Sequence, residues 1–116
     1  MPYIDIFNGD ADGILALHQL RLYNPQKSRL VTGVKRDNLL LQQVLSASNS
    51  VITVLDISSH ANREPLLQLL NQGNTIHYFD HHFAGELVES PLFHSHIDTN
   101  PGVCTSILVD RFLAGK

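Results

Sequence analysis

The run VITVL at residues 51–55 is the feature that most restricts how this chain folds. An apolar, β-branched run of this length is typical of a strand that is buried on both faces. Such strands occur in parallel sheets, because helices cover both sides of those sheets. The run therefore predicts an α/β domain built around a parallel sheet.

Segments typical of strands and of helices alternate along the rest of the chain. Strands are predicted over residues 2–7, 29–34, 51–55, 75–79 and 94–97, and helices over 12–23, 39–47, 61–71 and about 103–113. This alternation predicts βαβ units with right-handed connections. The expected fold class is α/β, a three-layer αβα Rossmann-like domain with a mostly parallel sheet of about five strands.

Length and composition fit one domain. The chain has 116 residues, 43% of them hydrophobic, and no internal repeat or linker, so residues 1–116 form a single predicted domain. It stops one helix after the last predicted strand, as the amino-terminal part of a longer protein would. No stretch approaches the roughly 20 apolar residues of a membrane span. The lone Cys104, and acids where a signal peptide would be basic, predict a cytoplasmic protein with no membrane partner.

The charge pattern bears on the partners. The formal net charge is −3, and the eight basic residues are scattered along the chain. Because no basic stripe is available to follow a polynucleotide backbone, long nucleic acid is disfavoured as a partner of this chain alone. Seven histidines are many for this length, and most of them fall in the second half, which favours metal or phosphate chemistry.

Acidic residues follow three of the predicted strands. Asp10 and Asp12 follow the first strand, Asp56 the third and Asp80 the fourth, with His81 next in the chain. The carboxyl ends of parallel strands share one edge of the sheet, so we expect these carboxylates to lie close together. Clustered carboxylates repel each other unless a cation neutralises them. Carboxylates with imidazoles suit Mn²⁺, Fe²⁺, Zn²⁺ or Mg²⁺, which predicts a divalent-metal site.

Other interpretations of these motifs are weaker. Asp-Ala-Asp-Gly alone is often a loop with a helix cap, and Asp-His-His alone can be a surface loop. An EF-hand loop starting at Asp10 would need Glu at its twelfth position, where this chain has Arg21. The first motif also looks like that of haloacid-dehalogenase-type phosphatases, which stay a minor alternative because the later motif here is Asp-His-His.

Four segments together resemble the DHH phosphoesterase superfamily over nearly the whole chain. They are FNGDADGI, VLDIS, FDHHF and NPGVCTSILVDRFL. The resemblance implies a manganese-type two-metal site that hydrolyses phosphoesters or phosphoanhydrides. It implies metal ligation by Asp10, Asp12, Asp56 and His81, with Asp56 bridging the metals. It further implies that Asp80, His81 and His82 are catalytic, Asp80 orienting the His81 ring and His82 facing the substrate phosphate.

The chain departs from the family pattern in two places. Asn8 stands at a first-motif position where many members have a His or a third Asp. The fourth-motif Asp and the carboxy-terminal substrate-binding domain would lie beyond Lys116, and Asp98 comes early in the chain to replace that Asp. Lys35 and Arg36, after the second strand, could bind a substrate phosphate or be a solvated pair. The helix start after Asn100 could offer N–H groups to a phosphate or be a plain cap.

The expected function is that of a metal-dependent phosphoesterase. It would hydrolyse phosphodiester or phosphomonoester bonds in small nucleotides or short oligonucleotides, with Mn²⁺ as the expected cofactor and Mg²⁺ or another divalent ion as alternatives. The alternative function is a catalytically incomplete metal- or nucleotide-binding, or regulatory, domain of the same fold. The sequence leaves open the substrate, the metal and whether the chain forms a homodimer.

Overall fold

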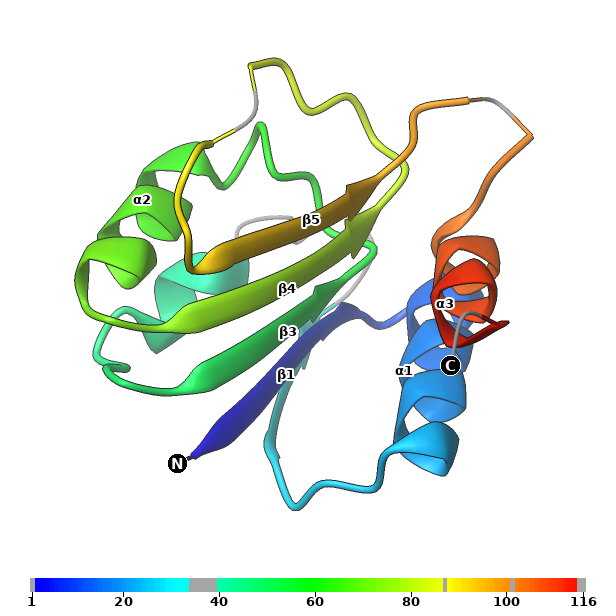
Figure 1. Ribbon diagram of the computed structural model, residues 1–116, viewed down its shortest axis with the longest axis horizontal. Helices are drawn as coiled ribbons and strands as arrows, with labels where there is room; N and C mark the ends of the chain where they lie inside the picture. Colours follow the sequence, from blue (N-terminus) through cyan, green and yellow to red (C-terminus); the bar gives the residue numbers. More distant parts are fainter. Residues whose placement is uncertain (1, 34–39, 87, 101, 115–116) are drawn as a thin grey trace.

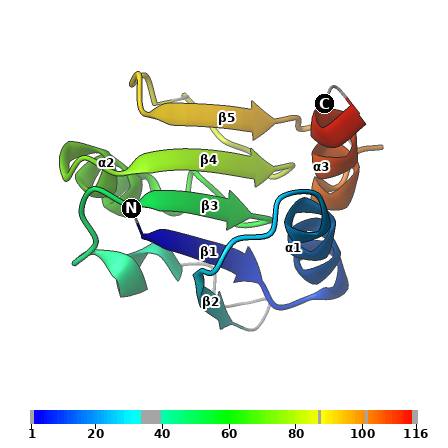
Figure 2. The ribbon, with the colours of Figure 1, turned by 60° about the horizontal axis from the view of Figure 1, so that its bottom comes forward.

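Five parallel strands form the centre of the fold. The computed structural model describes residues 2–33, 40–86, 88–100 and 102–114. The strands lie in the order β2-β1-β3-β4-β5, and every neighbouring pair is parallel (Figures 1 and 2). Their bounds are β1 Tyr3–Asn8, β2 Arg29–Gly33, β3 Val51–Leu55, β4 Thr75–Asp80 and β5 Phe93–Ile97.

Helices cover both faces of this sheet. Helices α1 (Ala11–Tyr23) and α3 (Thr105–Ala114) pack on one face, and α2 (Arg63–Asn71) lies on the other with the 3₁₀ helix η1 (Leu40–Val44) (Figure 1). The predicted three-layer α/β architecture is therefore confirmed. In the described residues, no helix is both long and apolar enough to cross a membrane.

One predicted helix is much shorter than expected. The sequence predicts a helix over residues 39–47, but residues 40–47, which are the part of this segment that is described, contain only the turn η1, whose apolar residues Leu40, Leu41 and Val44 are buried. The backbone then turns, and the Ala47 N–H donates to the Val44 carbonyl at 2.9 Å. Serine and asparagine follow this turn, and both residue types favour turns over helix interiors.

The β3 strand is buried on both faces, as its sequence predicts. Ile52 and Val54 belong to the core between the sheet and α2, and Leu55 belongs to the core beneath α1 and α3. On the α1/α3 face, the rings of His77 and His94 are stacked, with centroids 4.9 Å apart. The prediction that His94 and His96 share one face is confirmed, since His96 stacks on Phe79 of the same face.

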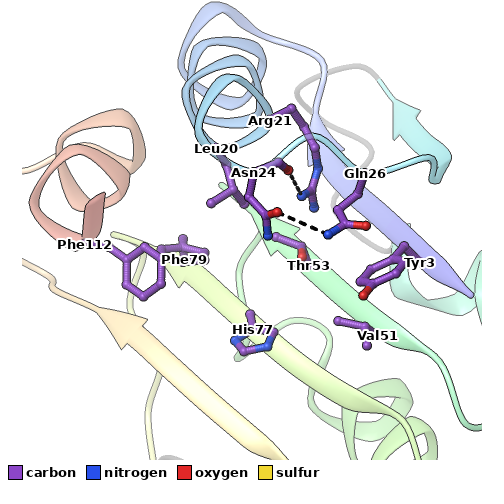
Figure 3. A pocket seen from close by; sticks show the side chains of 10 residues that line it. All are labelled: Tyr3, Leu20, Arg21, Asn24, Gln26, Val51, Thr53, His77, Phe79 and Phe112. Carbon is purple, nitrogen blue, oxygen red and sulfur yellow. Dashed lines mark hydrogen bonds between the residues drawn. The ribbon is translucent and has the colours of Figure 1, made fainter. Parts of the chain in front are cut away.

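The α1/α3 face is covered unevenly. A hollow of about 320 Å³ lies over the amino-terminal half of the strands, where Tyr3 and Val51 begin β1 and β3 (Figure 3). Arg21, Asn24 and Gln26 close it on the side of α1 (Figure 3). This hollow lies at the opposite end of the strands from the carboxylates predicted to bind metal.

A buried ion pair joins β1 to the end of α1. Asp5, inside β1, is fully buried and receives two hydrogen bonds from Arg21, Nε–Oδ2 at 2.9 Å and Nη2–Oδ1 at 2.7 Å. The Ser28 hydroxyl donates a third, at 2.7 Å. A buried carboxylate is costly unless it is paired and hydrogen-bonded, and here all three donors come from the connection between β1 and β2.

Removing Arg21 should therefore destabilise the fold strongly. We expect Arg21→Met to lower the free energy of unfolding by about 3 kcal/mol, because Asp5 would be left as an uncompensated buried charge. The matched control is Arg111→Met, since Arg111 pairs with Asp98 at 3.6 Å with both side chains largely exposed. That variant should change stability by less than about 0.5 kcal/mol. Urea unfolding of both measures the difference, and equal losses would contradict this assignment.

Candidate metal centre

The sheet topology brings the predicted acidic residues to one place. Strand β1 lies between β2 and β3, so the chain leaves β1 toward one side and later returns on the other. In sheets of this type, ligands bind in the crevice outside the carboxyl ends of the strands at such a change of direction. The carboxyl ends of β1, β3 and β4 meet there. Asp10 follows β1 and Asp12 lies in the first turn of α1, Asp56 follows β3, and Asp80 ends β4 with His81 and His82 after it.

The loop after β1 is fixed by short local contacts. Asp10 caps α1, its Oδ1 accepting from the Gly13 N–H at 3.1 Å, and Asn8 Oδ1 accepts from the Asp10 N–H at 3.3 Å. Position 13 must be glycine, because a Cβ there would lie 2.1 Å from the Asn8 carbonyl oxygen. The tight turn places Asp12 in the first turn of α1, beside the crevice.

The amino terminus of α3 holds the Asp12 carboxylate. The backbone N–H of Thr105 donates to Oδ2 at 3.0 Å, and that of Ser106 donates to Oδ1 at 2.9 Å. Burial raises the pKa of Asp12, but these hydrogen bonds outweigh it and leave the pKa below its usual value. The sequence leaves two roles open for this helix start, binding of a substrate phosphate or a plain helix cap. The structure supports the cap, because these N–H groups bind a carboxylate of the chain itself.

Asp56 lies at the centre of the cluster and is almost fully buried. It directly follows β3 and has a left-handed backbone, φ 65°, a strained conformation that is more frequent at functional sites. Its Oδ1 lies 3.0 Å from His81 Nε2 and accepts from the Thr105 hydroxyl at 3.1 Å. Burial, followed by the charges of Asp12 and Asp10, raises the pKa of Asp56 to about 7. Asp56 thus experiences the repulsion expected of clustered carboxylates.

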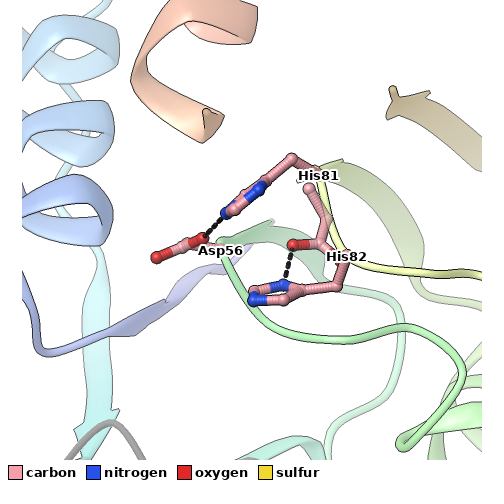
Figure 4. Close-up of side chains that lie close together, drawn as sticks. Asp56, His81 and His82 are labelled. Atoms are coloured by element: carbon pink, nitrogen blue, oxygen red, sulfur yellow. Dashed lines mark hydrogen bonds and ion pairs between the residues drawn. The ribbon is translucent and has the colours of Figure 1, made fainter. Parts of the chain in front are cut away.

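Asp80 pairs with His82 and not with His81. Its Oδ1 lies 2.6 Å from His82 Nδ1, so the expectation that Asp80 orients the His81 ring is wrong in this structure. The His81 ring instead turns toward Asp56 (Figure 4). Hydrogen bonding to Asp80 raises the pKa of His82 against the opposing effect of burial. The other oxygen of Asp80, Oδ2, is buried and has no hydrogen-bond partner among the described residues.

Four side chains form a group that could hold a metal ion. One ligand atom from each of Asp56, Asp80, His81 and His82 lies within 4.8 Å of the others. Of the predicted ligands, Asp56 and His81 belong to this group. Asp12 and Asp10 border it: Asp12 Oδ2 is 3.7 Å from His81 Nε2, and Asp10 is near enough to Asp56 to raise its pKa.

The remaining predicted site residues lie elsewhere. Lys35 and Arg36 fall outside the described residues. Asn8 turns its side-chain oxygen toward the backbone of Asp10. Asp98 accepts from the Asn100 N–H at 2.9 Å and pairs with Arg111, so its carboxylate is occupied away from the group.

The chemistry of the group fits a divalent cation. A buried carboxylate oxygen without a donor, Asp80 Oδ2, is costly unless a positive charge approaches it. A cation would also relieve the repulsion that raises the pKa of Asp56. The donor set of carboxylates and imidazoles matches Mn²⁺, Fe²⁺ or Zn²⁺ and does not by itself select among them.

Comparison with known proteins adds no assignment. No family model matches the chain, and no curated protein shows a significant match to it.

Sequence reasoning missed Thr105. Its side chain is fully buried and bonds Asp56, while its backbone bonds Asp12. The only sequence signal is a threonine at a helix start after Asn-Pro-Gly, which does not identify a partner 49 residues away. Thr105 orients two carboxylates at once, which is the role that outer hydrogen-bond partners have at metal sites.

Loss of the Thr105 hydroxyl should weaken metal binding. We expect Thr105→Val, which preserves the shape of the side chain, to lower Mn²⁺ affinity about tenfold, because Asp56 loses a donor that orients it. The control is Thr105→Ser, which retains the hydroxyl and should bind within about twofold of the unmodified chain. Calorimetric titration with Mn²⁺ measures both. Equal affinities in the two variants would contradict the positioning role.

The metal-free protein should lose stability as the pH rises from about 4 to about 7. An acid whose folded-state pKa is raised binds its proton more tightly when folded, so its ionisation disfavours the folded state up to a pH near 7 for Asp56. His82 acts in the same direction, because its raised pKa gives a stabilisation that is lost as the ring deprotonates. Urea unfolding in chelator at pH 5.5 and 7.5 measures the trend. Asp56→Asn should show a smaller fall, and an equal fall would contradict the contribution of Asp56.

Proposed function

We propose that this chain is a metal-dependent phosphoesterase of the DHH type. The proposed reaction is hydrolysis of phosphodiester or phosphomonoester bonds in small nucleotides or short oligonucleotides. The observation that carries the proposal is the four-residue group at the crevice, where the buried Asp80 Oδ2 lacks a donor within the described structure. The resemblance of four sequence segments to DHH phosphoesterases supports the same activity.

The residues of the site would bind the metal or hold the metal ligands in place. Asp56, Asp80 and His81 would hold a divalent ion, proposed to be Mn²⁺, and Asp10 and Asp12 offer further carboxylates for a second ion beside it. Bound metal would supply positive charge to the phosphoryl oxygens and lower the pKa of water. Thr105 and the amino terminus of α3 keep Asp56 and Asp12 in place.

His82 is the residue best suited to contact the substrate. Its ring is the most exposed of the group, with a side chain 43% accessible, while Asp80 fixes one ring nitrogen. Its raised pKa favours the protonated ring, which can donate a hydrogen bond to a phosphate oxygen from the nitrogen that Asp80 does not hold. The proposed role of His82 is therefore to orient and stabilise the phosphate.

The charge of the chain favours a small substrate. The net charge is −3 and the basic residues are scattered, so a long polyanion would gain little binding energy from this chain. A mononucleotide or short oligonucleotide places one or two phosphates at the crevice and needs no extended basic surface.

Replacing His81 should abolish hydrolysis. We expect His81→Ala to lower the Mn²⁺-dependent rate with bis(p-nitrophenyl) phosphate and with a dinucleotide by at least about 100-fold, because a ligand that contacts Asp56 is lost. The matched control is His18→Ala, an exposed histidine on α1 outside the group, which should retain the rate. Equal rates for His81→Ala and the unmodified chain would refute the proposal.

The same experiment distinguishes the proposed hydrolase from the alternative, a binding or regulatory domain without turnover. Within the described residues, Asn8 and Asp98 are both engaged away from the group, which favours this second candidate. Mn²⁺ binding that depends on His81, without turnover of either substrate, would establish it in place of the enzyme.

A further inference from the structure

An exposed aromatic side chain directly follows the proposed metal centre in the chain. Phe83 follows His82 in the chain, and its side chain is 69% exposed. The other exposed large aromatic side chain of the described structure, Tyr23 at 56%, ends α1 at the opposite end of the strands. Exposing a phenyl ring is unfavourable in water, so a ring at the rim of a ligand-binding edge suggests a contact with an apolar part of the ligand.

The surroundings of Phe83 hold the ring in place. His60, from the loop after β3, makes a T-shaped contact with it, with ring centroids 5.3 Å apart and planes at 62°. Gly85 brings the following turn close to both rings: it has a φ of +64°, and a Cβ there would lie 3.0 Å from His60 Nδ1 and 3.7 Å from Phe83 Cε2. The ring is therefore supported from the loops after β3 and β4, which also carry Asp56 and His82.

A hollow adjoins the ring. It has a volume of about 250 Å³ and is lined by Phe83, Ala84, Gly85, Ile97 and Thr99. Its wall has no charged side chain, in contrast to the acidic group beside it. Ile97 ends β5, and the Asp98 N–H donates to the Asp80 carbonyl at 3.2 Å, so the hollow borders the same strand ends as the centre.

We infer that Phe83 is a stacking platform for the base of a nucleotide whose phosphate occupies the proposed metal centre. The inference rests on the proposed function and specifies how the substrate is recognised. A nucleotide has a charged phosphate joined to a flat aromatic base, which matches a proposed metal site next to an uncharged hollow with an exposed ring. Stacking on a ring accepts any base, so the platform selects nucleotides over other phosphoesters without reading their sequence.

The kinetic test measures selectivity for the base. We expect Phe83→Ala to lower about tenfold the ratio of kcat/KM for a dinucleotide to kcat/KM for the same diester with abasic sugars, because stacking aids only the first substrate. Phe83→Tyr should retain the ratio. The matched control is Leu22→Ala, since Leu22 is equally exposed at 69% but lies near the end of α1.

A binding test works without turnover. The chain contains no tryptophan, so Phe83→Trp introduces a single fluorescent reporter at the platform. With Mg²⁺ present, adenosine 5′-monophosphate should quench its emission more than ribose 5-phosphate does at equal concentration, because only the first compound has a base to stack. Leu22→Trp, the control reporter, should respond equally to both compounds.

The two tests separate this inference from the proposed function. Selective quenching without any hydrolysis would support the platform and refute the phosphoesterase. Hydrolysis with an unchanged base-to-abasic ratio in Phe83→Ala, and with equal quenching by the two compounds, would overturn the platform and leave the phosphoesterase intact. Failure of both measurements would overturn both.

Discussion

Repulsion among carboxylates is the constraint around which the carboxyl edge of this sheet is organised. Asp10, Asp12, Asp56 and Asp80 reach that edge from three strands, and two of them are almost fully buried. The four carboxylates are compensated in three different ways. The helix cap satisfies Asp10, the amino terminus of α3 satisfies Asp12, and imidazole rings approach the other two. The compensation is incomplete, as the raised pKa of Asp56 and the unpartnered oxygen of Asp80 show.

Incomplete compensation distinguishes this edge from the other buried acid in the sheet. Asp5 is equally buried, yet Arg21 and Ser28 donate to both of its oxygens. Evolution of a stable fold alone would favour that solution everywhere, because uncompensated buried charge lowers stability. A site that retains unsatisfied carboxylate oxygens sacrifices stability where a ligand can restore it.

The features that the sequence predicts best are those encoded by local patterns. All five strands lie within a residue or two of their predicted positions, because apolar runs with acids or glycines after them are local signals. The meeting of Asp12, Asp56 and His81 followed from the rule that parallel strands share a carboxyl edge. The helix predicted at 39–47 failed because its apolar spacing fits one short turn as well as it fits a helix.

Contacts between distant side chains could not be predicted in the same way. The partners of Asp5 are Arg21 and Ser28, 16 and 23 residues away, and no local pattern identifies them. The choice of Asp80 between its two histidine neighbours depends on side-chain rotamers, which sequence spacing does not fix. Thr105 was missed for both reasons, since its contacts with Asp12 and Asp56 join residues that are 93 and 49 positions apart.

The hydrogen bonds from α3 to the Asp12 carboxylate can form only late in the synthesis of this chain. Synthesis proceeds from the amino terminus, so Asp12 leaves the ribosome 93 residues before Thr105, the first donor that holds it. Until α3 docks, the carboxylates at the edge of the sheet lack these donors, and the site remains unfinished although all five strands are present. Helix α3 thus completes a centre whose other parts were synthesised first, which ties ligand affinity to the docking of this helix.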